Sequence, residues 1–213
     1  NDGLSMLAVI ENATNDVTDM LHRMRELAIQ ATNDTNGSQD RIFLQKEVAE
    51  LIKEIDRVAD QTTYNDQVVL DGTFTSKSIQ VGTESGNKVT FSINGINTDE
   101  IGTTTSGATS YVSGISVATA SGAQAGLQVI TDAIEQVAGD RASYGALQNR
   151  LEYTVSNLMN VAEFTTAARS RIEDADFAAE SARLAKAQVL QQTGTAMLAQ
   201  ANASSQLALS LIR

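Results

Sequence analysis

Apolar residues recur at alternating intervals of three and four through three long segments of this chain, and no proline interrupts any of them. That spacing places one apolar stripe along an α-helix, and it is the spacing found in coiled coils. Proline would remove a backbone hydrogen bond inside a helix and clash with the preceding turn. The pattern therefore predicts a mainly α protein, an elongated antiparallel helical bundle or coiled coil.

We expect helices at about 2–33, 38–61 and 123–165. The Asn- and Gly-containing turn at 33–37 makes the first two antiparallel neighbours, with Ser38 as the predicted N-cap of the second. The first stripe comprises Leu7, Ile10, Thr14, Val17, Leu21, Met24, Ala28 and Ala31. The second comprises Leu44, Val48, Leu51, Ile55 and Val58. The third comprises Leu127, Ile130, Ile134, Val137, Tyr144, Leu151, Val155, Leu158 and Ala162.

Two polar residues, Arg141 and Gln148, interrupt the third stripe. Polar residues at such positions fix register and partner number in some coiled coils. Alternatively, the stripe rotates slightly and both side chains reach solvent. Since each residue adds about 1.5 Å, this helix would be some 60 Å long and would bind both earlier helices.

In the middle of the chain the helical spacing of apolar residues gives way to a different pattern. From about 64 to 101, short β-prone runs alternate with Gly, Asn and Ser, which predicts a small β-hairpin region. Its strands are expected at 78–81 and 89–93, joined by a turn at 84–87. The Ser/Thr-rich segment 103–122 is expected to be a loop or a weak strand.

The last segment, 169–213, is rich in Ala and Gln and is predicted to be helical. Its small side chains permit close helix approach but bury too little area to stabilise a lone helix. It is either a poorly ordered tail or a helix that requires copies of itself, and we favour the second interpretation. Asp174 and Asp176 flank the start of a helix, where carboxylates stabilise the exposed amides.

Composition excludes several function classes. The formal charge of −11 disfavours nucleic acid and anionic membrane surfaces, because both require clustered Lys and Arg. No apolar run is long enough to span a membrane. The chain has no Cys and one histidine, His22, so neither a Cys/His nor a Ser/His/Asp constellation is indicated. The 33–37 turn lacks the spacing of a calcium loop. We expect no catalysis, no cofactor and no metal site.

Several motifs, in this order, resemble the conserved terminal blocks of bacterial flagellins. The N-terminal motifs are Asn1–Ser5, Arg23–Gln30, Glu54–Val58 and Thr62–Leu70. The C-terminal motifs are Arg171–Phe177, Val189–Thr195 and Leu209–Arg213. The resemblance covers nearly the whole chain and is weakest in the segment 103–122.

The resemblance implies a structural subunit that is exported through the flagellar secretion channel and polymerises outside the cell into the filament used for swimming. Implied partners are other subunits, an export chaperone, the secretion apparatus, and the cap and hook-associated proteins. It implies a rod-like domain at 1–168 and an inner-tube helix at 169–213. We expect two departures from the family. The extreme N-terminal helix, on which self-assembly depends in the family, is missing, and the large outer domains are also missing, which implies a thin, smooth filament.

The resemblance also implies site residues. Detection by the vertebrate flagellin-sensing Toll-like receptor would involve Arg23, Leu27 and Glu47. Without the motif, Arg23 and Glu47 would be ordinary exposed charges and Leu27 a core residue. The residues expected to make self-assembly contacts are Phe177, Leu184, Leu190, Leu198, Leu207 and Leu211.

Two alternatives remain open. A hook–filament junction protein shares both terminal blocks but forms a short ring, and copy number per cell would separate it from a filament subunit. A secreted coiled-coil adhesin would bind a host surface without export-dependent polymerisation. The near-complete match at both blocks favours the filament subunit.

Overall fold

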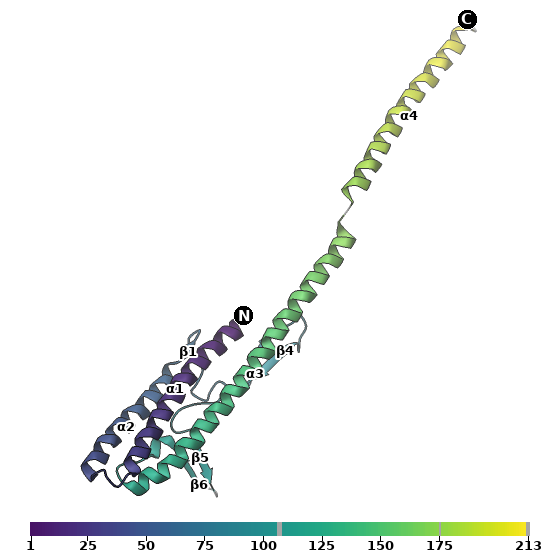
Figure 1. The fold of residues 1–213 in the computed structure, drawn as a ribbon. Coiled ribbons are helices and arrows are strands. Elements are labelled where there is room, and N and C mark those ends of the chain that lie inside the picture. Colours follow the sequence, from purple (N-terminus) through teal and green to yellow (C-terminus); the bar gives the residue numbers. More distant parts are fainter. Residues whose placement is uncertain (106–107, 175, 212–213) are drawn as a thin grey trace. The chain divides into compact units, whose positions relative to one another are not determined.

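The computed structural model describes the backbone of residues 1–105, 108–174 and 176–211, and the side chains of 1–103, 110–174 and 176–204. Four long helices dominate this part of the chain (Figure 1): α1 (Asp2–Thr32), α2 (Ser38–Gln61), α3 (Ala120–Glu173) and α4 (Phe177–Leu211). The chain divides into two compact units, Asn1–Asn157 and Leu158–Arg213. The predicted mainly α architecture is confirmed.

In the first unit, α1, α2 and the beginning of α3 run side by side (Figure 1). The turn between α1 and α2 is held by side chains, since Arg41 Nε donates a 2.8 Å hydrogen bond to the carbonyl of Ala31 near the end of α1. The predicted N-cap of α2 is wrong by one residue. Gly37 occupies that position and its backbone N–H donates to the Asp40 carboxylate, while Ser38 is the first helical residue.

The predicted stripe of α1 is confirmed at all eight positions, each of which is buried. In α3 the buried stripe includes a polar residue that the sequence interpretation missed, Asp140, which is 9% exposed. Arg141 and Gln148, the polar residues that sequence placed on the stripe, lie beside it and are half-buried. The seven-residue repeat runs through Ala123, Gly126, Ile130, Ala133, Val137, Asp140, Tyr144 and Leu151, all buried.

Between α2 and α3 the described strands form three separate antiparallel pairs. They are β1 (Thr63–Tyr64) with β2 (Gln67–Val68), β3 (Lys77–Gln80) with β4 (Lys88–Phe91), and β5 (Gly102–Thr105) with β6 (Ala108–Tyr111). The predicted hairpin corresponds to β3–β4, in the register Ile79↔Val89. The 103–122 segment contains the β5–β6 strands, the 3-10 turn η1 (Val112–Gly114) and the first residues of α3.

The irregular segments between the strands pack against the helices. Val69, Leu70, Ile93, Ile96 and Ile101 are completely buried. Backbone hydrogen bonds from Ile93 to Phe74 and from Ile96 to Leu70 join two of these segments to each other. Apolar burial and paired backbone groups therefore fix a region that has few strand residues.

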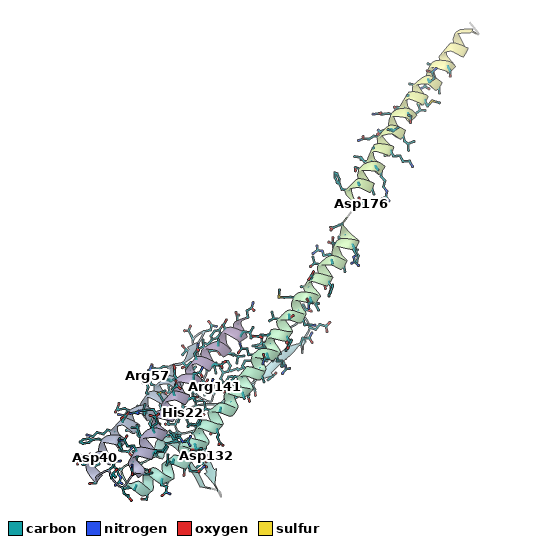
Figure 2. All side chains as sticks on the ribbon, viewed as in Figure 1. His22, Asp40, Arg57, Asp132, Arg141 and Asp176 are labelled. Carbon is teal, nitrogen blue, oxygen red and sulfur yellow. The ribbon has the colours of Figure 1, made fainter. Side chains whose placement is uncertain are left out.

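In the second unit, every described side chain from 158 to 204 is exposed. α3 continues into this unit as far as Glu173, beyond the expected end at 165, and α4 begins at Phe177. The Asp176 carboxylate accepts backbone hydrogen bonds from Ala178 at 2.9 Å and Ala179 at 3.3 Å. Asp176, labelled in Figure 2, therefore caps the start of α4, as predicted.

Candidate functional site

The second unit carries the largest set of exposed apolar side chains in the described chain. Four predicted assembly residues are among them: Phe177 is 86% exposed, Leu198 66%, and Leu184 and Leu190 are each 61%. Leu207 and Leu211 lie in the helical backbone of α4, but their side chains are outside the described residues. A 35-residue helix with no buried side chain among those described requires a partner surface for its stability.

Sequence reasoning missed further members of this apolar surface. Met159, Phe164, Ile172, Val189 and Met197 are all more than half exposed. The signal was present in the flagellin-like C-terminal motifs, two of which contain Ile172 and Val189. The predicted set was confined to α4, whereas Met159, Phe164 and Ile172 lie in the last part of α3.

A second predicted surface lies on neighbouring faces of α1 and α2. Arg23 Nε donates a 2.9 Å hydrogen bond to Glu47 Oε1, and its Nη2 forms an ion pair with the same oxygen at 2.8 Å. Arg23 Nη1 donates a second hydrogen bond, to Glu26 at 2.9 Å. The hydrogen bond to Glu47 is the main cause of a raised pKa for Arg23.

Arg23 and Glu47 are about half exposed, so other molecules can reach both. Leu27 differs, because it is only 1% exposed and belongs to the core. The alternative interpretation of Leu27 as a core residue therefore describes this structure. Its side chain packs beneath the surface that carries Arg23.

A polar cluster joins the chain after β4 to α3, with Asp140 and Tyr144 buried and Asn94 exposed. Asn94 donates its side-chain amide to Asp140 Oδ1 at 2.7 Å and its backbone N–H to the Tyr144 hydroxyl at 3.3 Å. Burial raises the pKa of Asp140, although the hydrogen bond from Asn94 opposes this. Burial, followed by the charge of Asp140, raises the pKa of Tyr144 to about 12. The hydrogen bonds of this cluster hold the chain after β4 against α3.

The described residues contain no group of three or more His, Cys, Asp or Glu side chains arranged for a metal ion. A hollow of about 650 Å³ lies beside η1 and the start of α3. Hydroxyls and Gln128 line it, with no carboxylate, His or Lys in its lining. His22 lies on α1 away from this hollow, exposed to solvent (Figure 2). Within the described chain, no helix is long and apolar enough to cross a membrane.

A helical core followed by a long helix whose exposed apolar side chains need a partner surface is typical of structural proteins that associate through their helices. Residues 1–75 match the family model of the bacterial flagellin N-terminal helical region, and residues 127–212 match that of the bacterial flagellin C-terminal helical region. The chain belongs to the bacterial flagellin family and is a structural subunit of the flagellar filament.

Curated relatives support the same family. A flagellin of Halalkalibacterium halodurans is 37% identical over 212 residues, which cover 100% of this chain and 75% of the relative. Flagellin FlaB1 of Treponema pallidum is 39% identical over 223 residues. The match covers 100% of this chain and 77% of the relative. Only residues 76–126 separate the two family regions, and the chain lacks the large variable domain of the family.

Solved structures agree with the fold. The crystal structure of Bacillus cereus flagellin matches with a TM-score of 0.62 at 28% sequence identity. The match covers 78% of this chain and 92% of the Bacillus cereus chain. FliC of Burkholderia pseudomallei has a TM-score of 0.63 over 70% of this chain at 21% identity, which shows the fold alone.

Proposed function

We propose that this subunit is exported through the flagellar secretion channel and polymerises outside the cell into a filament that drives swimming. The export chaperone, the secretion apparatus, and the cap and hook-associated proteins are its proposed partners. The observation that carries the proposal is the exposed apolar surface of residues 158–204 in a chain of the flagellin family.

Assembly gives this surface a physical purpose. Burying apolar area contributes roughly 25 cal/mol per Å², and Phe177, Leu184, Leu190 and Leu198 leave most of their side chains available for it. Residues such as Ala185, Ala196 and Ala199 keep the helix narrow between them. Helices of this kind pack closely, so subunit contacts would bury both the large and the small side chains.

Seeded filament growth, followed by electron microscopy, tests the proposal. The double variant Leu184→Asp with Leu198→Asp places charges on the apolar surface, and we expect it to abolish elongation of filament seeds. Ser181→Asp with Gln200→Asp is the matched control, because these side chains are also exposed in α4. The first unit should unfold at the same temperature in both variants.

Equal elongation by both double variants would contradict the assembly role of these leucines. A wild-type chain that forms short rings instead of extending seeds would instead indicate the junction-protein alternative.

We propose as a second function that the vertebrate flagellin-sensing Toll-like receptor recognises the surface around Arg23 and Glu47. The supporting observation is that these side chains, from two helices, form one exposed and hydrogen-bonded pair. A pair pre-ordered in this way loses little conformational entropy on binding. Leu27 is buried in the core, so it would affect recognition only through the packing of α1.

A receptor reporter assay with monomeric protein tests this second function. Arg23→Ala should weaken activation at least about fivefold, as substitution of an interface hot spot does. Arg25→Ala is the control, since Arg25 is exposed on the same helix two residues away. A wild-type monomer that gives no signal, or equal losses in the two variants, would refute the proposal.

A further inference from the structure

The sequence contains two Asn-Gly pairs, Asn36–Gly37 and Asn94–Gly95. Asparagine followed by glycine is the dipeptide most open to deamidation, because glycine has no Cβ to shield its backbone nitrogen from the preceding side-chain carbonyl. The two glycines lie in different surroundings, since Gly37 is exposed and Gly95 is buried, so the reactivity of the two pairs should differ in the folded protein.

Asn36–Gly37 lies in the turn between α1 and α2. Gly37 is exposed, and its backbone N–H donates a 3.0 Å hydrogen bond to Oδ2 of Asp40. Asp40 is the third residue of α2 and is also exposed (Figure 2). A general base must lie within about 2.6–3.2 Å of the atom from which it removes a proton. The Asp40 carboxylate satisfies that requirement for the Gly37 nitrogen.

We propose that Asn36 is a self-modification site, at which the Asp40 carboxylate acts as the base for deamidation by the Gly37 nitrogen. Asp40 removes the Gly37 amide proton as the nitrogen bonds to Cγ of Asn36. The C–N bond of the side-chain amide then breaks, and ammonia leaves with the proton returned from Asp40. The resulting succinimide is opened by one water molecule, which gives aspartate or isoaspartate at position 36.

Asn94–Gly95 has the same dipeptide but is restrained. The Asn94 amide is held by Asp140 at 2.7 Å, and the Asn94 backbone N–H donates to Tyr144. Gly95 is buried. Attack by the Gly95 nitrogen on the Asn94 side chain would require the hydrogen bonds to Asp140 and Tyr144 to break around a buried glycine, so the second pair is an internal control for the fold.

Modification of Asn36 has a structural consequence. Its side-chain amide donates to the carbonyl of Gln30, near the C-terminal end of α1. A carboxylate at position 36 removes that donor and places negative charge beside the negative end of the helix dipole. Isoaspartate also adds a methylene to the main chain of the turn. Either product loosens the connection that sets α1 against α2.

The test incubates the full folded chain at neutral pH and follows both pairs by peptide mass spectrometry, with isoaspartate-specific methylation as a second readout. Wild type should convert Asn36 and leave Asn94 intact. Asp40→Asn should slow conversion by about a hundredfold or more, the low end of what a positioned base contributes. Gly37→Ala should slow it as well, and its added Cβ fits, since the nearest atom is Asp40 Oδ2 at 3.4 Å.

Asp34→Asn is the matched control, because Asp34 is a fully exposed carboxylate in the same turn. It should leave the rate unchanged. In denaturant, wild type and Asp40→Asn should react equally at both pairs, which separates the role of Asp40 as a base from any effect on folding. If the hydrogen bond from Gly37 to Asp40 protects Asn36 from deamidation, folded Asp40→Asn will react faster than wild type. A faster or unchanged rate in folded Asp40→Asn, or conversion of Asn94 before Asn36, overturns the proposal.

Discussion

The Asn94 side-chain amide donates a 2.7 Å hydrogen bond to the Asp140 carboxylate, which ties the chain after β4 to the buried stripe of α3. The other carboxylate oxygen, Oδ2, is buried with no hydrogen-bond partner among the described residues. A buried polar group on an apolar stripe favours the one alignment that satisfies it. This pair therefore contributes to the register between the β region and the helices.

Asp140→Asn should stabilise the protein at neutral pH by roughly 1 kcal/mol, because a buried unpartnered charge costs more than the buried unpartnered amide group that replaces it. The asparagine oxygen still accepts the hydrogen bond from Asn94, and the buried charge is removed. Denaturant unfolding of the wild type and the variant at neutral pH measures the difference. A variant less stable than wild type would show that the charge stabilises the fold.

The same residue predicts a pH dependence. Because burial raises the folded-state pKa of Asp140 above its ordinary value of 3.8, the folded state binds its proton more tightly than the unfolded state. Its stabilising contribution is complete below 3.8 and is lost as the pH rises through the raised folded pKa. The advantage of Asp140→Asn over wild type should therefore disappear in acid. Unfolding free energies of both proteins across that range test this, and a constant difference would contradict it.

Asp56→Ala should destabilise the first unit by roughly 1–3 kcal/mol, the cost of leaving buried donors unpaired. The Asp56 carboxylate accepts hydrogen bonds from the backbone N–H and the hydroxyl of Thr98, both at 2.8 Å. Thr98 is 1% exposed, so water does not replace the lost acceptor. Thermal unfolding measures the loss, with Asp60→Ala as a control at an exposed acid on α2. Equal effects of the two variants would refute this role.

Sequence periodicity was sufficient to predict the helices, because burial on one face of a helix repeats with the helical period. All eight stripe residues of α1 are buried, and the β3–β4 hairpin lies within a residue or two of its predicted position. The same periodicity, continued through Val137 and Tyr144, includes Asp140. The predicted stripe passed through Leu127, Ile134 and Arg141, whereas the buried residues are those one position earlier, Gly126, Ala133 and Asp140.

The remaining differences depend on contacts that sequence does not reveal. Asp140 is accommodated by Asn94, which lies 46 residues away in the chain. Gly37 caps α2 because Asp40 accepts its N–H, so the better capping residue Ser38 moves into the first helical position. Leu27 is different, since the sequence already offered its burial as the alternative to a recognition role, and the structure has it buried.

Ile10 and Ile29 provide a matched test of the predicted core. Ile10 is completely buried in α1, and Ile29, on the same helix, is 54% exposed. Ile10→Ala should cost about 2–5 kcal/mol of unfolding free energy, because it removes buried methyl groups and leaves a cavity. Ile29→Ala should change stability by no more than about 0.5 kcal/mol. Similar losses at both positions would mean that the surface of Ile29 is covered in the monomer.

The last prediction concerns α4. In the monomer, hydrogen exchange in α4 should be much faster than in α1, because no described α4 side chain is buried and the helix opens without breaking a core. Gly194 lies inside α4 with open space around its Cα, so Gly194→Ala should stabilise the helix by about 1 kcal/mol and slow its exchange. Ala196→Gly should have the opposite effect. In assembled filaments exchange should be slow in all three proteins, since subunit contacts and not intrinsic propensity would then hold the helix. Equal protection of α4 and α1 in the monomer would contradict the prediction, because α4 would then be stable without partner subunits.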